Sequence, residues 1–259
     1  MARLVAVYFS GTGNTEYVVE RLVSRLEYDS KVVYSIEDEV LFDEILSSAD
    51  DIIVAYPIVG GNIPIIMREF LRRYESKMWG KSLITIVTEA GFSGDGGALA
   101  YRLLATDKIM YKASYHIIMP TNVSFGRLFK VKNGDALDRR ISHANAKIDG
   151  IARDMNNGVY KKVGSSKLSY ILGYHLQRKH FDAIEPELRK KFSVDNTECV
   201  QCGKCIRLCP MHNISLEHGR IVGNDRCTLC YRCIHACPTN AITLLHREEV
   251  QYKGVKRGL

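Results

Sequence analysis

The chain has 259 residues, of which 46% are hydrophobic and 25% are charged. Its length exceeds that of a typical single domain, and its apolar content excludes a disordered chain, so we expect two domains with real cores. The formal net charge of +7 resides in the C-terminal half, because residues 1–124 hold more acidic than basic residues. This charge alone would suit a nucleic-acid-binding protein, but the cysteines described below make that a minor hypothesis.

The N-terminal apolar run covers residues 4–9, which is too short for the core of a signal peptide. The apolar region 52–67 is interrupted by prolines and glycines and predicts no transmembrane helix. We therefore expect a cytoplasmic protein.

Residues 3–10, RLVAVYFS, predict a strand, and residues 16–27, EYVVERLVSRLE, predict an amphipathic helix. The turn between them is rich in glycines and in hydroxyl and amide side chains: Ser10, Gly11, Thr12, Gly13, Asn14 and Thr15. Backbone amides at a helix start, surrounded by such side chains, form a cradle for phosphate.

Two classes of phosphate ligand are excluded by what the turn lacks. It has no Lys-Ser/Thr pair, so it is not the loop that binds a metal-bound triphosphate. Glu16 stands where a dinucleotide-binding loop has its third glycine. The turn resembles the FMN-phosphate loop of flavodoxins, and an ordinary glycine-rich turn is the alternative.

Strands and helices alternate through the N-terminal part. Strands are predicted at residues 31–35, 51–56, 82–88 and 115–119, and helices at 43–48, 65–76, 97–105 and 136–156. This alternation predicts an α/β fold with a doubly wound parallel sheet. The flavodoxin-like order, 2-1-3-4-5, would place a ligand between the first and third strands.

Two further loops leave the carboxyl ends of predicted strands, and both are rich in glycine. The first comprises Tyr56, Pro57, Ile58, Val59, Gly60, Gly61 and Asn62, and the second includes Thr88, Glu89, Ala90, Gly91, Phe92, Gly94, Asp95, Gly96 and Gly97.

The resemblance to flavodoxins, which covers residues 1–158, implies that these loops hold the isoalloxazine ring of FMN. The glycines would let backbone amides approach the ring, with Tyr56 and Phe92 as stacking candidates. Ile58 and Val59 would leave one ring face open.

Residues 159–195 predict a basic helical connector. Its apolar positions recur at helical spacing: Leu168, Ile171, Leu172, His175 and Leu176. We expect the apolar face to join the two domains, with contact to a membrane surface as the alternative.

All eight cysteines lie between residues 199 and 237 in two copies of Cys-x2-Cys-x2-Cys-x3-Cys-Pro, offset by 28 residues. This is the bacterial ferredoxin pattern for [4Fe-4S] clusters. A disulfide framework would suit a short secreted chain, and structural zinc uses separated Cys-x2-Cys pairs. Residues 196–246 resemble two-cluster ferredoxins, and we expect this small α+β domain, with a charged tail, to cover residues 196–259.

In this pattern the fourth cysteine of each run ligates the other cluster. One predicted set is therefore Cys199, Cys202, Cys205 and Cys237, and the other is Cys209, Cys227, Cys230 and Cys233. The repeat continues beyond the ligands, with Ile214 opposite Ile242 and Leu216 opposite Leu244. Ligation deprotonates the thiols, so the loaded protein would be near neutral.

The whole chain resembles flavodoxin-ferredoxin fusions of the EFR type. This resemblance implies an iron-sulfur flavoprotein that relays electrons between FMN and two clusters. The competing hypothesis is an FMN-dependent reductase of a small acceptor such as a quinone or another flavin. A third hypothesis, a redox sensor, has no recognisable output domain in this sequence to support it. We expect an acidic soluble electron carrier or redox enzyme as the partner. The predicted docking face consists of Arg178, Lys179, Arg189, Lys190 and Lys191.

Overall fold

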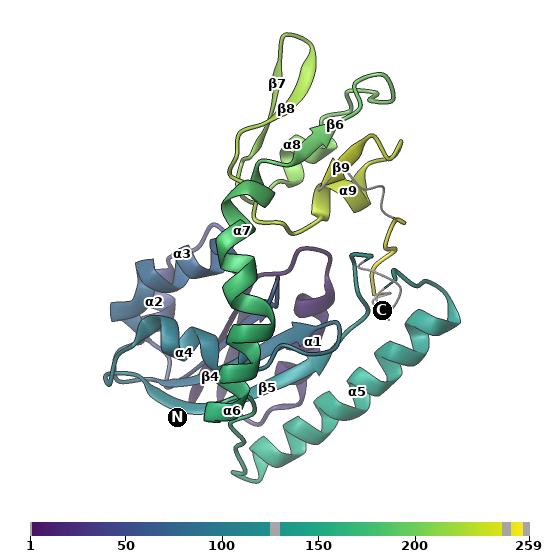
Figure 1. Cartoon of the computed structure of the whole chain (residues 1–259). Helices are drawn as coiled ribbons and strands as arrows, with labels where there is room; N and C mark the ends of the chain where they lie inside the picture. The colour runs from purple at the N-terminus through teal and green to yellow at the C-terminus, as the bar shows by residue number, and fades with distance from the viewer. Residues whose placement is uncertain (1, 125–129, 245–249, 256–259) are drawn as a thin grey trace.

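The computed structural model describes residues 2–124, 130–244 and 250–255, so that only residues 250–255 of the predicted charged tail are covered. Its N-terminal part is a layered α/β domain, and the cysteine-rich part forms a smaller unit at one end of it (Figure 1). A long helical segment, which contains α7, runs along the first unit up to the second. Among the described residues, no helix is both long and apolar enough to span a membrane.

The central sheet has five parallel strands in the order β2-β1-β3-β4-β5. The strands are β1 (Arg3–Tyr8), β2 (Ser30–Ser35), β3 (Asp51–Pro57), β4 (Ser82–Glu89) and β5 (Met110–Ile118). The predicted order and fold class are confirmed. The last strand begins five residues earlier than expected, because Met110 already pairs with Ser82.

Alternate side chains of the strands pack on opposite faces of this sheet, which gives two apolar cores. Ala6 and Ile53 point into the core under α1 (Asn14–Arg25) and α5 (Asp135–Asn156). Val7 and Val54 point into the other core. That core is covered by α2 (Phe42–Ser47), α3 (Ile65–Tyr74) and α4 (Leu99–Leu104), with short 3-10 turns at Glu75–Met78 and Gly96–Ala98.

The connector forms α6 (Lys167–Gly173), a π-helical turn (Tyr174–Arg178) and α7 (Lys179–Arg189). The helix is confirmed, but the role expected for its apolar face is wrong. Leu168 and Leu176 are 65% and 67% exposed, whereas Gly173, Arg178 and Phe181 are buried. The sheet loops therefore pack against the opposite face of the helix.

The cysteine-rich unit repeats its own structure after 28 residues. Its elements are β6 (Phe192–Val194), α8 (Lys204–Leu208), β7 (Ile214–Glu217), β8 (Arg220–Gly223), α9 (Arg232–Ala236) and β9 (Ile242–Leu244). Left-handed backbone recurs at matched positions, with φ of 51° at Gln201 and 57° at Leu229, and 68° at Gly203 and 61° at Tyr231. The two loops between cysteines thus follow the same path, as the duplicated sequence predicts.

The two copies differ after their helices. Strand β7 forms a hairpin with β8, whereas β9 pairs with β6. Leu244 is consequently buried, and its counterpart Leu216 is 53% exposed on the hairpin.

Candidate functional site

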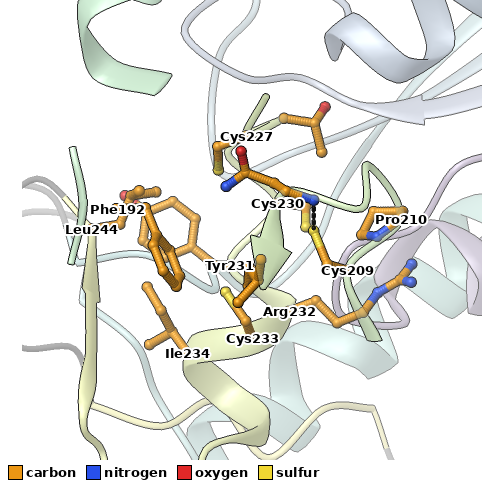
Figure 2. Close-up of a pocket in the computed structure, with 13 residues that line it drawn as sticks. Phe192, Cys209, Pro210, Cys227, Cys230, Tyr231, Arg232, Cys233, Ile234 and Leu244 are labelled. Atoms are coloured by element: carbon orange, nitrogen blue, oxygen red, sulfur yellow. Dashed lines mark hydrogen bonds between the residues drawn. The ribbon is translucent and has the colours of Figure 1, made fainter. Parts of the chain in front are cut away.

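The eight cysteines line two separate cavities. Cys209, Cys227, Cys230 and Cys233 line one cavity, and we call this set the inner site (Figure 2). Cys199, Cys202, Cys205 and Cys237 line the second cavity, and we call this set the outer site. Each cavity combines three cysteines of one run with the fourth cysteine of the other run. These groupings match the two predicted ligand sets.

Three thiols of the inner site, those of Cys227, Cys230 and Cys233, are buried in protein. Burial raises the pKa of Cys227 to about 11 and that of Cys230 to about 12, and it also raises the pKa of Cys233 well above its ordinary value. Such thiols stay protonated unless a cation compensates the buried charge of the thiolates. Iron provides this compensation, so this donor set fits an iron-sulfur cluster.

Backbone amides are directed at the sulfur atoms of the inner site. The amide of Asn213 donates to Cys209 Sγ and that of Leu229 to Cys227 Sγ, both at 3.3 Å. Leu229 adopts φ of 57°, which turns its amide toward the preceding cysteine. Hydrogen bonds to sulfur are one of the means by which a protein sets a cluster potential.

The predicted phosphate loop forms the start of α1. Gly13 adopts φ of 92° before the helix begins at Asn14, and its amide donates to Ser10 Oγ at 3.1 Å. Thr15 and Thr88 share a buried hydroxyl hydrogen bond of 2.8 Å, which ties the loop to β4. The amides of the first helical turn have no partners within the helix, and residues 10–15 carry no acidic side chain. This loop fits a bound phosphate.

The two loops predicted for the flavin ring are only partly accessible. Tyr56, Gly61, Thr88, Gly94, Asp95, Gly96 and Gly97 are buried, and Pro57, Ile58, Val59, Asn62, Glu89, Ala90 and Gly91 are half-buried. Gly60 and Phe92 are exposed, Phe92 by 51%. Phe92 thus remains a stacking candidate.

Tyr56 does not stand at a stacking position, contrary to our prediction. It is 0% exposed, and its hydroxyl donates to the Gly96 carbonyl at 2.9 Å and accepts from the Ala100 amide at 3.2 Å. Because both sides of the hydroxyl are bonded in the core, the ring is a structural element that joins β3 to α4.

Several glycines of these loops face the connector helix. A Cβ on Gly60 would lie 2.0 Å from the Phe181 ring, and one on Gly94 would lie 2.4 Å from Gly173 Cα. These glycines permit close packing of the helix, which is a different role from the predicted approach to a flavin.

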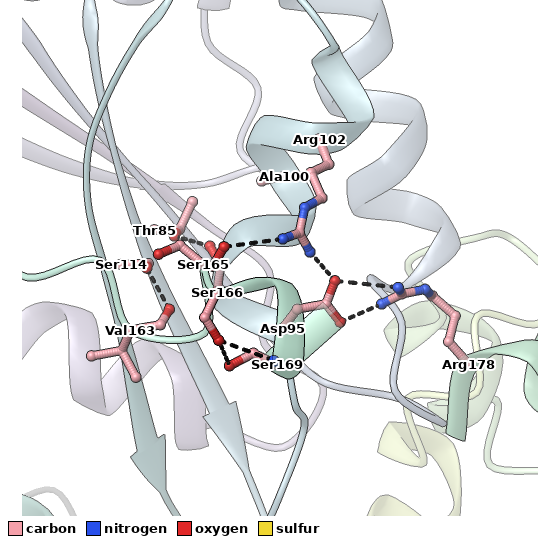
Figure 3. A network of polar contacts seen from close by, with 12 residues as sticks. Thr85, Asp95, Ala100, Arg102, Ser114, Val163, Ser165, Ser166, Ser169 and Arg178 are labelled. Carbon is pink, nitrogen blue, oxygen red and sulfur yellow. Dashed lines mark hydrogen bonds and ion pairs between the residues drawn. The ribbon is translucent and has the colours of Figure 1, made fainter. Parts of the chain in front are cut away.

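A buried ion cluster fixes the second loop to the same helix. Asp95 is 0% exposed and receives two hydrogen bonds from Arg178, at 2.7 and 3.2 Å, together with an ion pair from Arg102 (Figure 3). Arg178 is itself 7% exposed, so it cannot belong to the docking face that we predicted. Its guanidinium is paired with Asp95 in the interior of the protein.

The inner site lies directly against the phosphate loop. A Cβ on Gly11 would stand 2.5 Å from the Cys230 carbonyl oxygen, so only glycine permits this approach. Arg232, two residues after Cys230, donates to the carbonyls of Ser10 at 2.7 Å and Gly11 at 3.1 Å. Its guanidinium also pairs with Glu37 through two contacts of 2.6 Å.

The residues after the second cysteine run add contacts that the sequence did not indicate. Tyr252 is 4% exposed, and its hydroxyl donates to Asn14 Oδ1 at 2.7 Å. The Tyr252 amide donates to His235 Nδ1 at 3.0 Å, and His235 Nε2 lies 2.7 Å from the Asn122 carbonyl oxygen. The sequence signal for this contact is an aromatic residue, Tyr252, within an otherwise charged tail.

Comparisons with known proteins assign both units. A flavodoxin domain model matches residues 5–95, and a 4Fe-4S dicluster domain model matches residues 198–242. The chain joins a flavodoxin domain to a dicluster domain. A search of curated proteins gave no match. The narrower resemblance to EFR-type ferredoxins stays a prediction.

Solved structures with some likeness to the chain include three flavoproteins. A flavodoxin from the domain Archaea is 18% identical, with a TM-score of 0.39, over 59% of this chain and 97% of that one. Fusobacterium nucleatum flavodoxin bound to flavin mononucleotide is 14% identical, with a TM-score of 0.42, over 61% and 99% of the two chains. A putative flavoprotein from Bacteroides eggerthii DSM 20697 is 17% identical, with a TM-score of 0.38, over 46% and 89%.

The domain assignment implies the cofactors. A flavodoxin domain binds FMN, and the dicluster domain with its eight cysteines binds two [4Fe-4S] clusters. The cysteine set of the inner site and the phosphate loop described above fit these groups. The chain is an FMN and iron-sulfur electron-transfer protein.

Proposed function

We propose that the chain relays electrons between its dicluster domain and its flavodoxin domain within one molecule. The contact between Gly11 and Cys230 carries this proposal, because it joins a predicted FMN loop to a predicted cluster ligand. The clusters supply single-electron transfer, and FMN accepts one or two electrons. Arg232 holds the two domains in register through its bonds to the phosphate loop.

We assign the cysteine ligands of the two clusters from the two cavities. We assign one cluster to the inner site and the other to the outer site, as defined above. The outer site is the nearer to solvent, because Cys202 is exposed and its neighbour Val200 is 62% exposed. Electrons from a partner would therefore enter or leave at the outer site.

For FMN, the phosphate loop would bind the phosphate through the amides at the start of α1. The ring would contact the loop residues that stay half-buried or exposed. These candidates are Pro57, Ile58, Val59, Gly60, Asn62, Glu89, Ala90, Gly91 and Phe92. Val59 also packs against the core of the dicluster domain, so the side of the ring that it lines would face that domain.

The partner at the outer site would be an acidic soluble carrier in the cytoplasm. Lys204 and Arg207 are exposed beside Cys202. With Arg189, Lys190 and Lys191 they form the proposed docking face, from which Arg178 and Lys179 are left out. Attraction between opposite charges speeds association and weakens with salt. The rate of electron exchange with such a carrier should fall between low and high salt. A rate that salt does not change would reject this docking face.

A reductase of a small acceptor is the second candidate, and the 51% exposure of Phe92 favours it because a ring beside this residue would be reachable. A screen of quinones and flavins with the photoreduced protein separates the two functions. Saturable turnover with one acceptor would support the reductase, and its absence would leave the relay.

The composition of the anaerobically purified protein tests the proposal first. We expect about eight iron, eight acid-labile sulfide and one FMN per chain. Eight iron without flavin would reject the relay, since the flavodoxin domain would then bind something else. As a control, Cys202→Ser should lower the iron content while FMN stays bound.

A further inference from the structure

The connector helix exposes an apolar stripe that faces away from the protein. Leu168, Ile171, Leu172 and Leu176 form this stripe, and they are 65%, 41%, 36% and 67% exposed. Counted from Leu168, the residues stand at positions i, i+3, i+4 and i+8, so they lie along one side of the helix. Isolated apolar side chains are normal on a surface, whereas a contiguous row indicates an interaction site.

The other side of the helix is already occupied. Gln177 donates to the Phe92 carbonyl at 2.9 Å, Arg178 pairs with Asp95, and Phe181 covers Gly60. The helix is thereby held in one orientation on the flavodoxin domain. The stripe cannot rotate inward without breaking the buried ion pair.

Positive charge surrounds the stripe. Residues 155–181 contain no acidic residue, and Lys162, Lys167 and Lys179 are exposed along them. His175 lies between Ile171 and Leu176 and is also exposed. Lys161 is excluded from this set, because it pairs with Asp154 at 2.6 Å. An apolar row flanked by lysines is the pattern of a helix that lies on an anionic lipid surface.

Other occupants fit less well. A symmetric dimer through the stripe would bring the same lysines of two copies together, which is unfavourable. A redox partner would have to sit near a cluster, but α6 lies at the end of the molecule away from α8, β7 and β8 (Figure 1). A membrane needs only a convex apolar row, which a single exposed helix provides.

We propose that the stripe docks the protein onto an anionic membrane surface. Leu168, Ile171, Leu172 and Leu176 would enter the interfacial region, and Lys167 and Lys179 would contact lipid phosphates. The outer site would remain free for a partner, because it lies at the opposite end of the molecule. This proposal is independent of the relay.

Vesicle sedimentation with the fully loaded chain tests it. We expect binding to vesicles that contain one third phosphatidylglycerol and little binding to pure phosphatidylcholine, with a loss at high salt. The double variant Leu168→Ser/Leu176→Ser should abolish binding, and Lys167→Gln and Lys179→Gln should each weaken it about fivefold. Leu41→Ser is the matched control, since Leu41 is 67% exposed outside the stripe. Iron content and circular dichroism verify that each variant is folded.

Three results would overturn the proposal. These are equal binding to both kinds of vesicle, no binding at all, and binding that the serine variants do not reduce. Size-exclusion chromatography with light scattering tests whether a second copy of the chain binds the stripe instead. A dimer that disappears in Leu168→Ser/Leu176→Ser would assign the stripe to a second copy of the chain.

Discussion

Tyr56 illustrates what a sequence motif leaves open at the scale of a residue. It stands near the end of the buried strand β3 and precedes a glycine pair, which is also where a flavin-stacking aromatic would stand. Its hydroxyl finds partners in Gly96 and Ala100, residues that lie 40 and 44 positions away. Local sequence does not encode such partners. The cysteines behave differently, because the duplicated spacing alone predicts the groupings seen around the two cavities.

Tyr56→Phe should destabilise the protein by roughly 1–3 kcal/mol near neutral pH, because the Ala100 amide and Gly96 carbonyl lose their partner. Burial raises the pKa of Tyr56 above its ordinary value of 10.0. The unfolded chain therefore loses this proton at lower pH than the folded one, and the stability of the parent protein falls as the pH rises above about 10.

Phenylalanine cannot ionise, so the stability difference between parent and Tyr56→Phe should narrow above about pH 10. Denaturant titrations at about pH 8 and about pH 11 measure it. The same difference at both pH values would contradict the burial of this hydroxyl.

At the scale of elements, periodicity predicts the connector helix but not which of its faces meets the protein. The apolar side is exposed, and the side with Gly173, Arg178 and Phe181 is buried. Glycines decide this choice, because Gly60 and Gly94 let the helix approach the two loops. The sequence shows that both loops are rich in glycine. It does not show whether the glycines allow a ligand or a helix to approach, because both need a residue without a side chain. A π-helical turn at residues 174–178 accompanies the buried Arg178.

Gly60→Ala tests this packing. Gly60 and Gly80 both have positive φ, 58° and 76°, but a Cβ on Gly80 would meet open space. Each substitution should cost about 1–2 kcal/mol of backbone strain, and Gly60→Ala should cost a further 1–3 kcal/mol, roughly, from the clash with Phe181.

Equilibrium denaturation of both variants gives the difference. Phe181→Ala should remove most of the extra cost in the double variant. Equal costs for Gly60→Ala and Gly80→Ala would show that the helix does not press on this loop.

At the scale of the molecule, the fold of each domain follows from sequence pattern, and the way the domains meet does not. Alternating strands and helices predict the sheet order, and the 28-residue repeat predicts the paired cysteine loops. The interface depends on single residues without a motif, such as Arg232, Glu37 and Tyr252. The position equivalent to Arg232 in the first repeat is Lys204, which is exposed. The sequence repeat therefore could not show that only its second copy packs against the flavodoxin domain.

Arg232 has two effects that substitution can separate. Arg232→Gln removes the bonds to Ser10, Gly11 and Glu37 and also a positive charge near Cys230, so both interdomain transfer and the inner cluster potential should fall. Arg232→Lys keeps the positive charge but loses the planar guanidinium that donates several hydrogen bonds at once. Interdomain electron transfer should therefore slow, while the potential of the inner cluster changes little.

Potentiometry and flash reduction of the loaded protein measure these quantities. Arg220→Gln, an exposed position of the same domain, serves as the control and should change neither. If Arg232→Gln transferred electrons as fast as the parent, the guanidinium would not be what holds the interface.

The relay within one molecule is tested most directly by the concentration dependence of interdomain electron transfer. The loaded protein is flash-reduced at the dicluster domain under anaerobic conditions, and reduction of the flavodoxin domain is followed by its absorbance. Because Cys230 contacts Gly11 in the same chain, we expect a rate that stays constant over a wide range of protein concentration. A rate that rises in proportion to concentration would show transfer between molecules and contradict the account.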